Sequence, residues 1–184
     1  MLDTQLAKMT SWFADAGSEA SVAVCSQCSL MRNLADFAFP ATCLDEDNRA
    51  VRERVVGALG QSLASERGEY RSLSMLTVNE CRILAERRLI PAHMLLCRVH
   101  GGVFLSEDQS LSVCVNGQDH ICMTSSGPGL HVKESWSRLS AVDDLLARSL
   151  DYAFSKRFGY LTSSLRHVGR GLKASVLLHL PALA

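Results

Sequence analysis

The chain has no excess of charge of either sign and no long apolar run. It carries 19 Lys plus Arg and 19 Asp plus Glu, so its formal net charge is zero. A balanced charge excludes bulk attraction to nucleic acid or to an anionic membrane surface. The chain also lacks a membrane-spanning apolar stretch and the pattern of a secretory signal. We therefore expect a cytoplasmic protein with no nucleic-acid or membrane partner.

A closed disulfide framework is also missing, because the chain has seven cysteines and an odd number cannot pair fully. The spacing Cys25-x-x-Cys28 is compatible with zinc or redox chemistry, but tetrahedral zinc needs four ligands and no second pair is present. We expect no metal site and favour reduced core thiols, typical of a reducing compartment. Six cysteines lie among apolar residues: Cys25, Cys28, Cys81, Cys97, Cys114 and Cys122.

The chain of 184 residues is long enough for one domain with a substantial core, and 47% of it is hydrophobic. Apolar spacing predicts helices over 3–16, 45–63, 77–88 and 133–158. Strands are expected over 21–30, 69–76, 99–105, 110–115, 121–124 and 175–180, with Gly127-Pro128-Gly129 as a break. Thr77 and Glu80 fit a capping box, and Ser106 to Gln109 a solvated hairpin turn. Without regular βαβ alternation, this mixture predicts an α+β fold with an antiparallel sheet flanked by helices.

Four stretches in chain order carry a resemblance to bacterial protein arginine kinases, of the ATP:guanido phosphotransferase family. The first, Cys25-Ser26-Gln27-Cys28-Ser29-Leu30-Met31-Arg32-Asn33, is similar to the family's Ser-Ser-Arg-x-Arg-Leu-Ala-Arg-Asn. The second, Asn116-Gly117-Gln118-Asp119-His120, corresponds to its Asn-Glu-Glu-Asp-His. The others run from Asp143 to Ser163 and from Gly169 to Leu183. The resemblance implies a phosphagen-kinase catalytic-domain fold (glutamine synthetase/guanido kinase type) over residues 1–184, incomplete at the C-terminal end.

Most of the family's arginines are replaced in this chain. The resemblance implies a set of arginines for phosphoryl transfer, because a planar guanidinium meets phosphate oxygens in bidentate fashion. The resemblance places the nucleotide-binding arginines at Gln27, Ser29 and Cys122, and a fourth at Lys173, which keeps the charge without the fork. His179 lies in the segment that approaches the nucleotide in the family, although a core-packed strand histidine is the commoner case.

The family's catalytic carboxylate and cysteine are replaced as well. The Glu-Glu pair falls at Gly117 and Gln118, and the reactive cysteine at Ser164. A glutamine cannot act as a base, and a serine hydroxyl is not ionised near neutral pH. Asn116, Asp119, His120 and the glycines Gly159, Gly169 and Gly171 are retained, which we interpret as fold-holding, with a hydrogen-bonded structural role for His120.

Three hypotheses follow. The first is a catalytically degenerate domain that binds a protein partner: a zinc-binding activator protein, an active kinase homologue or a second copy of itself. The second is an active kinase that uses Mg-ATP, in which Lys173 and the basic cluster Arg166, His167 and Arg170 hold the phosphates. A solvated loop explains that cluster more simply. The third is a fragment without selected function. We expect no bound cofactor in the first case.

Overall fold

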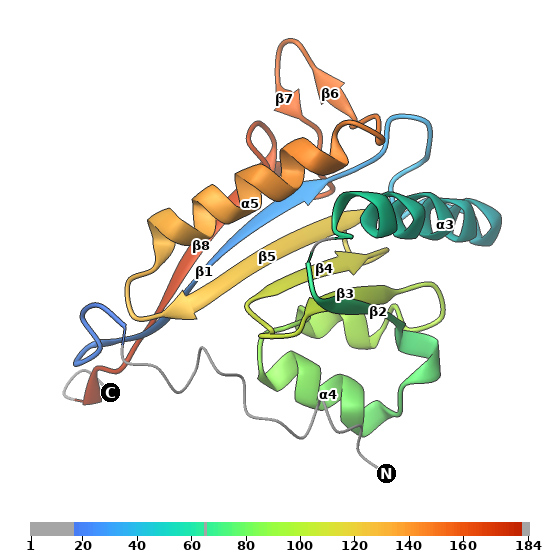
Figure 1. Ribbon diagram of the computed structural model, residues 1–184. Helices are drawn as coiled ribbons and strands as arrows, with labels where there is room; N and C mark the ends of the chain where they lie inside the picture. The colour runs from blue at the N-terminus through green and yellow to red at the C-terminus, as the bar shows by residue number, and fades with distance from the viewer. Residues whose placement is uncertain (1–16, 65, 182–184) are drawn as a thin grey trace.

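The computed structural model describes residues 17–64 and 66–181. Six strands form one antiparallel sheet in the order β2-β3-β4-β5-β1-β8 (Figure 1). Their bounds are β1 Ala23–Arg32, β2 Gly68–Ser72, β3 Gly102–Ser106, β4 Leu111–Val115, β5 Ile121–Pro128 and β8 Leu172–Leu178. A separate small hairpin pairs β6 (Phe154–Ser155) with β7 (Gly159–Tyr160). The predicted α+β fold with an antiparallel sheet is confirmed.

Helices cover both faces of the sheet. Helices α3 (Asp45–Ser62) and α5 (Val132–Leu146) pack on one face, and α4 (Val78–Glu86) lies against the other. Short 3-10 helices accompany them: η1 (Leu73–Met75), η2 (Ala92–Leu95) and η3 (Leu165–His167). No helix in the described residues is long and apolar enough to cross a membrane.

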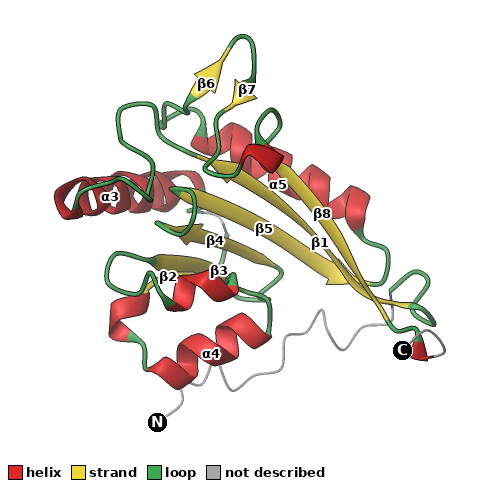
Figure 2. Ribbon diagram, turned by 180° about the vertical axis from the view of Figure 1, so that it is seen from behind, coloured by secondary structure: helices red, strands yellow, loops and turns green. Residues whose placement is uncertain are grey.

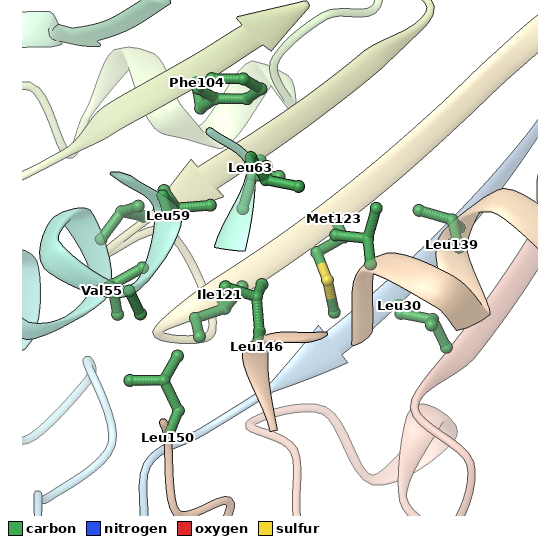
Figure 3. Packing of buried hydrophobic residues seen from close by; sticks show 14 of the residues in the cluster. Leu30, Val55, Leu59, Leu63, Phe104, Ile121, Met123, Leu139, Leu146 and Leu150 are labelled. Carbon is green, nitrogen blue, oxygen red and sulfur yellow. The ribbon is translucent and has the colours of Figure 1, made fainter. Parts of the chain in front are cut away.

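Strand alternation divides the buried residues into two cores. Leu30 of β1, Ile121 and Met123 of β5, and Leu139 and Leu146 of α5 belong to the larger core under α3 and α5 (Figure 3). The smaller core lies under α4 and contains Cys81, Leu84, Val103 and Cys114, among others. Because alternate residues of a strand point to opposite faces, β4 is buried on both sides.

Local sequence signals explain where α4 and α3 begin. Thr77 caps α4 through the Glu80 N–H, and the Glu80 carboxylate accepts from the Thr77 N–H, so the predicted capping box is confirmed. Helix α3 has no side-chain cap, but its first turn carries three acidic residues that suit its positive end.

Several predicted boundaries are wrong. Helix α5 ends at Leu146 rather than at residue 158, because the Ala35 N–H donates to the Asp151 carbonyl and the Ala153 N–H donates to the Asn33 carbonyl. These tertiary bonds pull the backbone out of the helix, although the apolar spacing continues. Strand β5 extends through Gly127 to Pro128, where a break was predicted. The predicted helix over 3–16 lies outside the described residues.

The cysteine interpretation is confirmed in part. All seven cysteines fall in the described residues and none forms a disulfide. Four of the six that were predicted to be core thiols are buried, but Cys97 and Cys122 are only half-buried. Burial raises the pKa of the Cys25 and Cys28 thiols, which keeps both protonated at neutral pH.

A buried ion pair joins β1 to α5. The guanidinium of Arg32 donates from Nε to Asp143 Oδ1 at 3.1 Å and from Nη2 to Oδ2 at 2.6 Å. Its Nη1 donates to the carbonyls of Met31 and Arg170, and its Cζ lies 3.7 Å from the centre of the Tyr160 ring. The Arg32 residue is only 3% exposed, so its charge is buried but well supplied with partners.

Gly171 lets the chain approach this ion pair closely. Its φ is +63°, and a Cβ at this position would lie 2.4 Å from the Met31 carbonyl oxygen and 2.6 Å from Arg32 Nη1. Only glycine fits a left-handed conformation at such a distance. The glycine that was predicted to hold the fold therefore does so by fitting the segment before β8 against Arg32.

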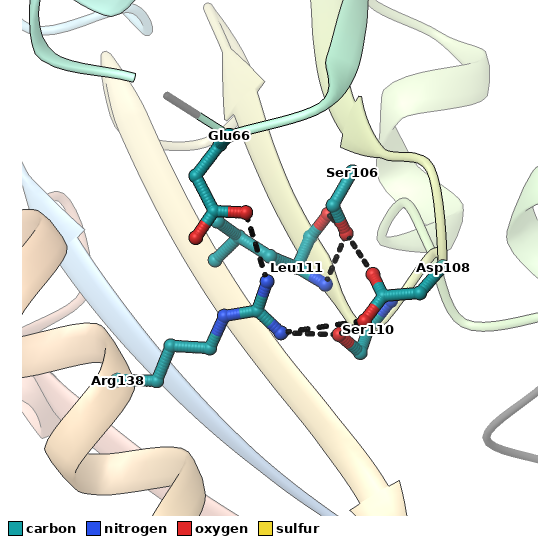
Figure 4. Close-up of polar contacts among 6 residues, drawn as sticks. All are labelled: Glu66, Ser106, Asp108, Ser110, Leu111 and Arg138. Carbon is teal, nitrogen blue, oxygen red and sulfur yellow. Dashed lines mark hydrogen bonds and ion pairs between the residues drawn. The ribbon is translucent and has the colours of Figure 1, made fainter. Parts of the chain in front are cut away.

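A second polar cluster joins α5 to the β3–β4 hairpin (Figure 4). Asp108 accepts hydrogen bonds from Ser106 Oγ at 2.5 Å and from Ser110 Oγ at 2.6 Å, and Arg138 of α5 lies 3.7 Å from it. Arg138 also pairs with Glu66 at 3.2 Å. The predicted solvated turn is confirmed, because Glu107 and Asp108 are both exposed, and Asp108 in addition holds the hairpin through these hydrogen bonds.

Removal of one partner of the buried ion pair should destabilise the fold strongly. We expect Asp143→Ala to lower the free energy of unfolding by about 3–5 kcal/mol, because Arg32 then keeps an uncompensated buried charge. The double variant Arg32→Met, Asp143→Leu should recover much of that loss. Urea denaturation followed by circular dichroism measures both. The control is Arg54→Met at the exposed pair with Asp36, expected to cost under about 1 kcal/mol; equal losses at both pairs would contradict the prediction.

The stability contributed by Asp108 should depend on pH. Burial alone would raise its pKa, but hydrogen bonds from Ser106 and Ser110 and the charge of Arg138 outweigh burial and hold the pKa below 3.8. A carboxyl group whose pKa is lower in the folded state than in the unfolded state stabilises the fold fully at pH values above its unfolded-state pKa. This stabilisation is lost as the pH falls through its folded-state pKa. The difference in unfolding free energy between wild type and Asp108→Asn should therefore shrink below about pH 3.8. The exposed Glu107→Gln change is the control, and a difference that stays constant down to pH 2 would refute the assignment.

Candidate functional site

A cavity of about 480 Å³ lies on the α4 side of the sheet, where the open face of β5, β1 and β8 meets the end of α4 and η2. In Figure 2 these three strands lie in front of α5. Cys28 and Leu30 of β1 pack in the core with α5 and alternate with the residues that line the cavity, so the cavity is on the face opposite that helix. Its floor is formed by alternate strand residues: Gln27, Ser29 and Met31 of β1, Cys122 and Thr124 of β5, and Lys173 and Ser175 of β8.

Five of the seven predicted site residues line this one cavity: Gln27, Ser29, Gln118, Cys122 and Lys173. The sheet register explains why they meet. Ser29 is paired with Thr124 of β5 on one side and with Lys173 of β8 on the other. Paired residues of neighbouring strands point to the same face, so residues far apart in the sequence form rows across the floor.

Neutral hydrogen bonds occupy the part of the floor that β1 and β5 form. Gln27 Nε2 donates to Ser126 Oγ at 2.8 Å and to the Arg88 carbonyl at 3.3 Å. Ser29 Oγ lies 2.9 Å from Thr124 Oγ1. Burial raises the pKa of the Cys122 thiol to about 11, so this thiol is protonated at neutral pH. The three positions thus offer amide, hydroxyl and thiol groups, and no positive charge.

Positive charge at the cavity comes from Lys173 of the floor and from Arg88 at the end of α4. His167 of η3 lines the cavity as well. His93 accepts a hydrogen bond from the Gln118 N–H at 3.1 Å, and burial lowers its pKa, so it is neutral at pH 7. Of the predicted basic cluster, Arg166 and Arg170 are exposed and do not line the cavity.

Arg88 and His93 were not predicted as site residues. They lie 61 or more positions from Gln27 in the sequence, and only the fold of the α4–η2 segment over the sheet brings them to the cavity. The sequence gives one signal for a charge at the edge of a core. Two adjacent arginines, Arg87 and Arg88, directly precede the buried pair Leu89-Ile90.

Asp119 is the only carboxylate among the described residues that line the cavity. Its Oδ1 accepts from Asn33 Nδ2 at 2.7 Å and from the Ser163 N–H at 2.6 Å, and the residue is 3% exposed. These bonds tie the β4–β5 turn to the end of β1 and to the loop before η3. Asp119 is therefore at once a fold-holding residue and the one negative charge at the cavity.

His120 has the structural role that was predicted. Its Nδ1 accepts from the Leu34 N–H at 3.1 Å, and its Nε2 lies 3.1 Å from the Ala38 carbonyl, to which it donates. Both ring nitrogens are thus used, and burial lowers the pKa, which favours the neutral ring. This histidine is not a base facing the cavity.

Two predicted site residues do not line the cavity. Ser164 precedes η3 and is half-buried, and its carbonyl accepts from Thr162 Oγ1 at 2.8 Å. His179 follows β8 and is exposed, so the expectation of a core-packed histidine is wrong. No group of three or more His, Cys, Asp or Glu residues that could hold a metal ion occurs within 17–64 and 66–181.

Comparison with known proteins gives a consistent picture. The family model for the C-terminal catalytic domain of ATP:guanido phosphotransferases matches residues 50–184. The chain is 38% identical over 175 residues to the protein-arginine kinase of Shouchella clausii, covering 94% of this chain and 49% of that protein. It is 39% identical, with the same coverages, to the protein-arginine kinase of Desulforamulus reducens. The chain thus spans about half the length of the curated relatives it matches.

Solved structures show the same fold. The duplicated taurocyamine kinase from Schistosoma mansoni, with bound transition state analog components, superposes with a TM-score of 0.81 at 24% identity, over 96% of this chain and 26% of that one. Lombricine kinase superposes with a TM-score of 0.72 at 22% identity, over 98% of this chain and 53% of that one. The phosphagen-kinase type of fold is confirmed. On the sequence matches, the chain belongs to the ATP:guanido phosphotransferase family, and its curated relatives are protein-arginine kinases.

Proposed function

We propose that this chain is a protein-arginine-kinase-like domain that has lost phosphoryl transfer and acts as a regulatory pseudokinase by binding a protein partner. The observation that carries the proposal is that the β1 and β5 positions in the floor of the cavity are neutral. Gln27, Ser29 and Cys122 occupy three positions at which the family resemblance places arginines, and hydrogen bonds within the sheet hold Gln27 and Ser29.

The energetic consequence for nucleotide binding is large. A hydrogen bond to a charged group contributes roughly 1.5–3 kcal/mol, so three lost cations correspond to about 5–9 kcal/mol if they act independently. A micromolar affinity is worth about 8 kcal/mol in total. The loss therefore removes most of the free energy that would hold Mg-ATP in the manner of the family.

The acceptor side of the reaction is weakened in the same way. An arginine nitrogen attacks only after it gives up a proton, and a positioned base typically supplies roughly 10²–10⁴-fold in rate. Gln118 lines the cavity but cannot take a proton, and Ser164 cannot replace a thiolate. Asp119 is the remaining carboxylate, and its Oδ1 is committed to Asn33 and Ser163.

Binding to a protein partner explains why the fold is retained although the catalytic and nucleotide-binding residues are replaced. The resemblance implies two candidates: the small zinc-binding activator protein of this family, and an active kinase homologue with which the chain pairs. Assembly with a second copy is a third arrangement. The seven free cysteines support a cytoplasmic setting for any of these complexes, because thiols remain reduced there.

The second candidate function is a divergent kinase that transfers the γ-phosphate of Mg-ATP to protein arginine. It is favoured by the cations Arg88 and Lys173 at the cavity, which replace part of the lost charge. In that case Arg88 and Lys173 would hold the phosphate groups, and the chemistry would depend on the magnesium ion carried by the nucleotide.

Titration calorimetry of Mg-ATP into the folded chain separates the two functions. For a pseudokinase we expect no measurable heat up to about 1 mM nucleotide, because Gln27, Ser29 and Cys122 offer the phosphates no charge-assisted hydrogen bond. Circular dichroism on the same sample verifies that it is folded. Micromolar binding that Lys173→Met abolishes, while the exposed control Arg170→Met leaves it intact, would reject the pseudokinase and favour the divergent kinase.

A transfer assay tests the chemistry directly. With γ-labelled ATP, Mg²⁺ and an arginine-rich protein substrate, we expect no acid-labile phosphoarginine above background at neutral pH. The matched pair is Arg88→Met, in the cavity wall, and Arg87→Met, its neighbour in sequence outside the cavity lining. Transfer that disappears in Arg88→Met and persists in Arg87→Met would show an active enzyme and refute the proposed loss of catalysis.

A further inference from the structure

A second cavity, of about 370 Å³, lies on the other side of the β4–β5 turn, which contributes Asn116 and Gly117 to its wall. The next two residues of the turn line the first cavity, so one short turn separates the two. Two polar residues of the second cavity are used within the fold. Asn116 Nδ2 donates to two backbone carbonyls, and Asp45, the only carboxylate among the described residues of the lining, lies 3.0 Å from His100. Charge without a partner lies elsewhere, on the surface around the β6–β7 hairpin.

Positive charge is concentrated in the last part of the sequence. Residues 152–184 contain five Lys or Arg residues and no Asp or Glu, whereas residues 1–151 contain the other 14 Lys or Arg and all 19 Asp or Glu. One of the five, Lys173, lines the first cavity. The other four are exposed, two of them in the turn of the β6–β7 hairpin and two in the η3 loop (residues 164–170): Lys156, Arg157, Arg166 and Arg170. A chain with no net charge therefore presents a local excess of positive charge.

The hairpin and the η3 loop form one hydrogen-bonded unit. The Tyr160 N–H donates to the Gly169 carbonyl at 2.8 Å, and the Gly169 N–H donates to the Tyr160 carbonyl at 3.1 Å. The Tyr160 ring in turn covers the buried Arg32 guanidinium. Figure 1 shows the hairpin projecting beyond the end of α5, away from the sheet. The four cations are thus carried by a surface that the fold holds in place and leaves open to a partner.

Apolar side chains are exposed among these cations. Phe154 and Phe158 of the hairpin are 58% and 54% exposed, and Leu165 of η3 is 90% exposed. The Phe154 ring lies edge-to-face on Tyr160, with the ring centres 5.3 Å apart, and Arg157 Cζ lies 4.9 Å from the centre of the Phe158 ring. Exposed apolar groups gathered within a rim of polar residues are typical of protein–protein contact sites.

None of the four cations has an acidic partner in the described part of the chain. The arginine ion pairs of the described residues involve other positions: Arg32, Arg54, Arg67, Arg71 and Arg138. The nearest acidic residue in the sequence, Asp151, is exposed and precedes the hairpin. Like charges on one surface repel one another, so an acidic ligand lowers their electrostatic free energy. The surface therefore favours a partner that brings both carboxylates and an apolar side chain.

The chemistry of the surface favours a short acidic peptide over a membrane or a nucleic acid. Lys156 and Arg157 lie in the turn itself, beside Phe158, so the phenyl ring cannot enter a bilayer unless two cations enter with it, which is costly. A long polyanion such as nucleic acid extends past this surface onto the rest of the molecule, where residues 1–151 carry more acidic than basic groups and repel it. A peptide makes all of its contacts within the surface.

We propose that the β6–β7 hairpin and the η3 loop are a docking surface for an acidic segment of a partner protein. The carboxylates of this segment pair with the four cations, and a bulky apolar side chain packs on Phe154 and Phe158. The inference rests on the proposed function in that the chain binds a protein, and it names the surface and the chemistry of the segment that is recognised there. None of these residues lines the first cavity.

The test uses the full chain and the probe peptide acetyl-Glu-Asp-Leu-Glu-Asp-amide, with binding followed by the backbone amide resonances of the protein. We expect saturable shifts at Ser155, Arg157, Gly159 and Gly169. The peptide acetyl-Gln-Asn-Leu-Gln-Asn-amide keeps the shape without the charge and should bind about tenfold more weakly, roughly the value of two exposed ion pairs. Acetyl-Glu-Asp-Gly-Glu-Asp-amide lacks the leucine and should bind about threefold more weakly, because the apolar contact is missing.

Matched variants locate the surface on the protein. Lys156→Gln should weaken the acidic peptide about threefold. Lys133→Gln removes the same charge from an exposed position in the first turn of α5, at the other end of that helix, and should leave the affinity unchanged. Phe158→Ala should weaken the leucine peptide about threefold and the glycine peptide by a smaller factor, because both changes remove the same contact. Circular dichroism verifies that each variant is folded.

Several outcomes would overturn the proposal. These are equal binding of the acidic and neutral peptides, equal effects of Lys156→Gln and Lys133→Gln, shifts confined to the first cavity, or no binding at millimolar peptide. Tighter binding of a thymidine octamer or of phosphatidylserine vesicles than of the peptide, weakened by Lys156→Gln, would assign the surface to nucleic acid or membrane. A dimer in sedimentation velocity that Phe158→Ala abolishes would assign it to a second copy. The peptide titrations contain no ATP, so their failure leaves the proposed loss of catalysis standing, and binding of Mg-ATP leaves the docking surface standing.

Discussion

The contacts of Arg32 fix how helix α5 and the edge strand β8 lie on β1. One guanidinium at the end of β1 contacts the carboxylate of α5, the carbonyl before β8 and the Tyr160 ring of the small hairpin. These segments lie 111 or more positions along the chain from Arg32. Hydrogen bonding of the buried charge therefore sets how α5 and β8 lie on β1, and with them the row that contains Ser29 and Lys173.

Strand alternation explains how a site can change while the fold remains. Cys28 and Leu30 belong to the core under α3 and α5, whereas Gln27 and Ser29, their neighbours in β1, face the cavity. The same division holds in β5, where Ile121 and Met123 are core and Cys122 is not part of that core. A substitution on the cavity face removes no contact from the larger core, so the side chains there can differ without loss of packing.

Much of the fold was predictable because its signals are local. The capping box at Thr77, the hairpin between β3 and β4, and the acidic start of α3 each depend on residues a few positions apart. The end of α5 was not predictable from spacing, because hydrogen bonds from 33–35 to 151–153 decide it. Floor residues of the cavity followed from the family resemblance, while Arg88 and His93 depend on how α4 and η2 pack over the sheet. The sequence showed the short-range signals, but it did not show which distant residues the fold brings together.

The β4–β5 turn links the two cavities through the same residues that hold the fold. Asn116 has a φ of 54°, a conformation that asparagine tolerates better than most residues, and it bonds to α3 and to the segment after η2. Two residues later the Gln118 N–H donates to His93, and Asp119 holds Asn33 and the Ser163 N–H. Because the turn is hydrogen-bonded at both ends, a shift of its backbone at one cavity also moves polar groups at the other. The turn therefore joins the walls of the two cavities through hydrogen bonds that also hold the fold.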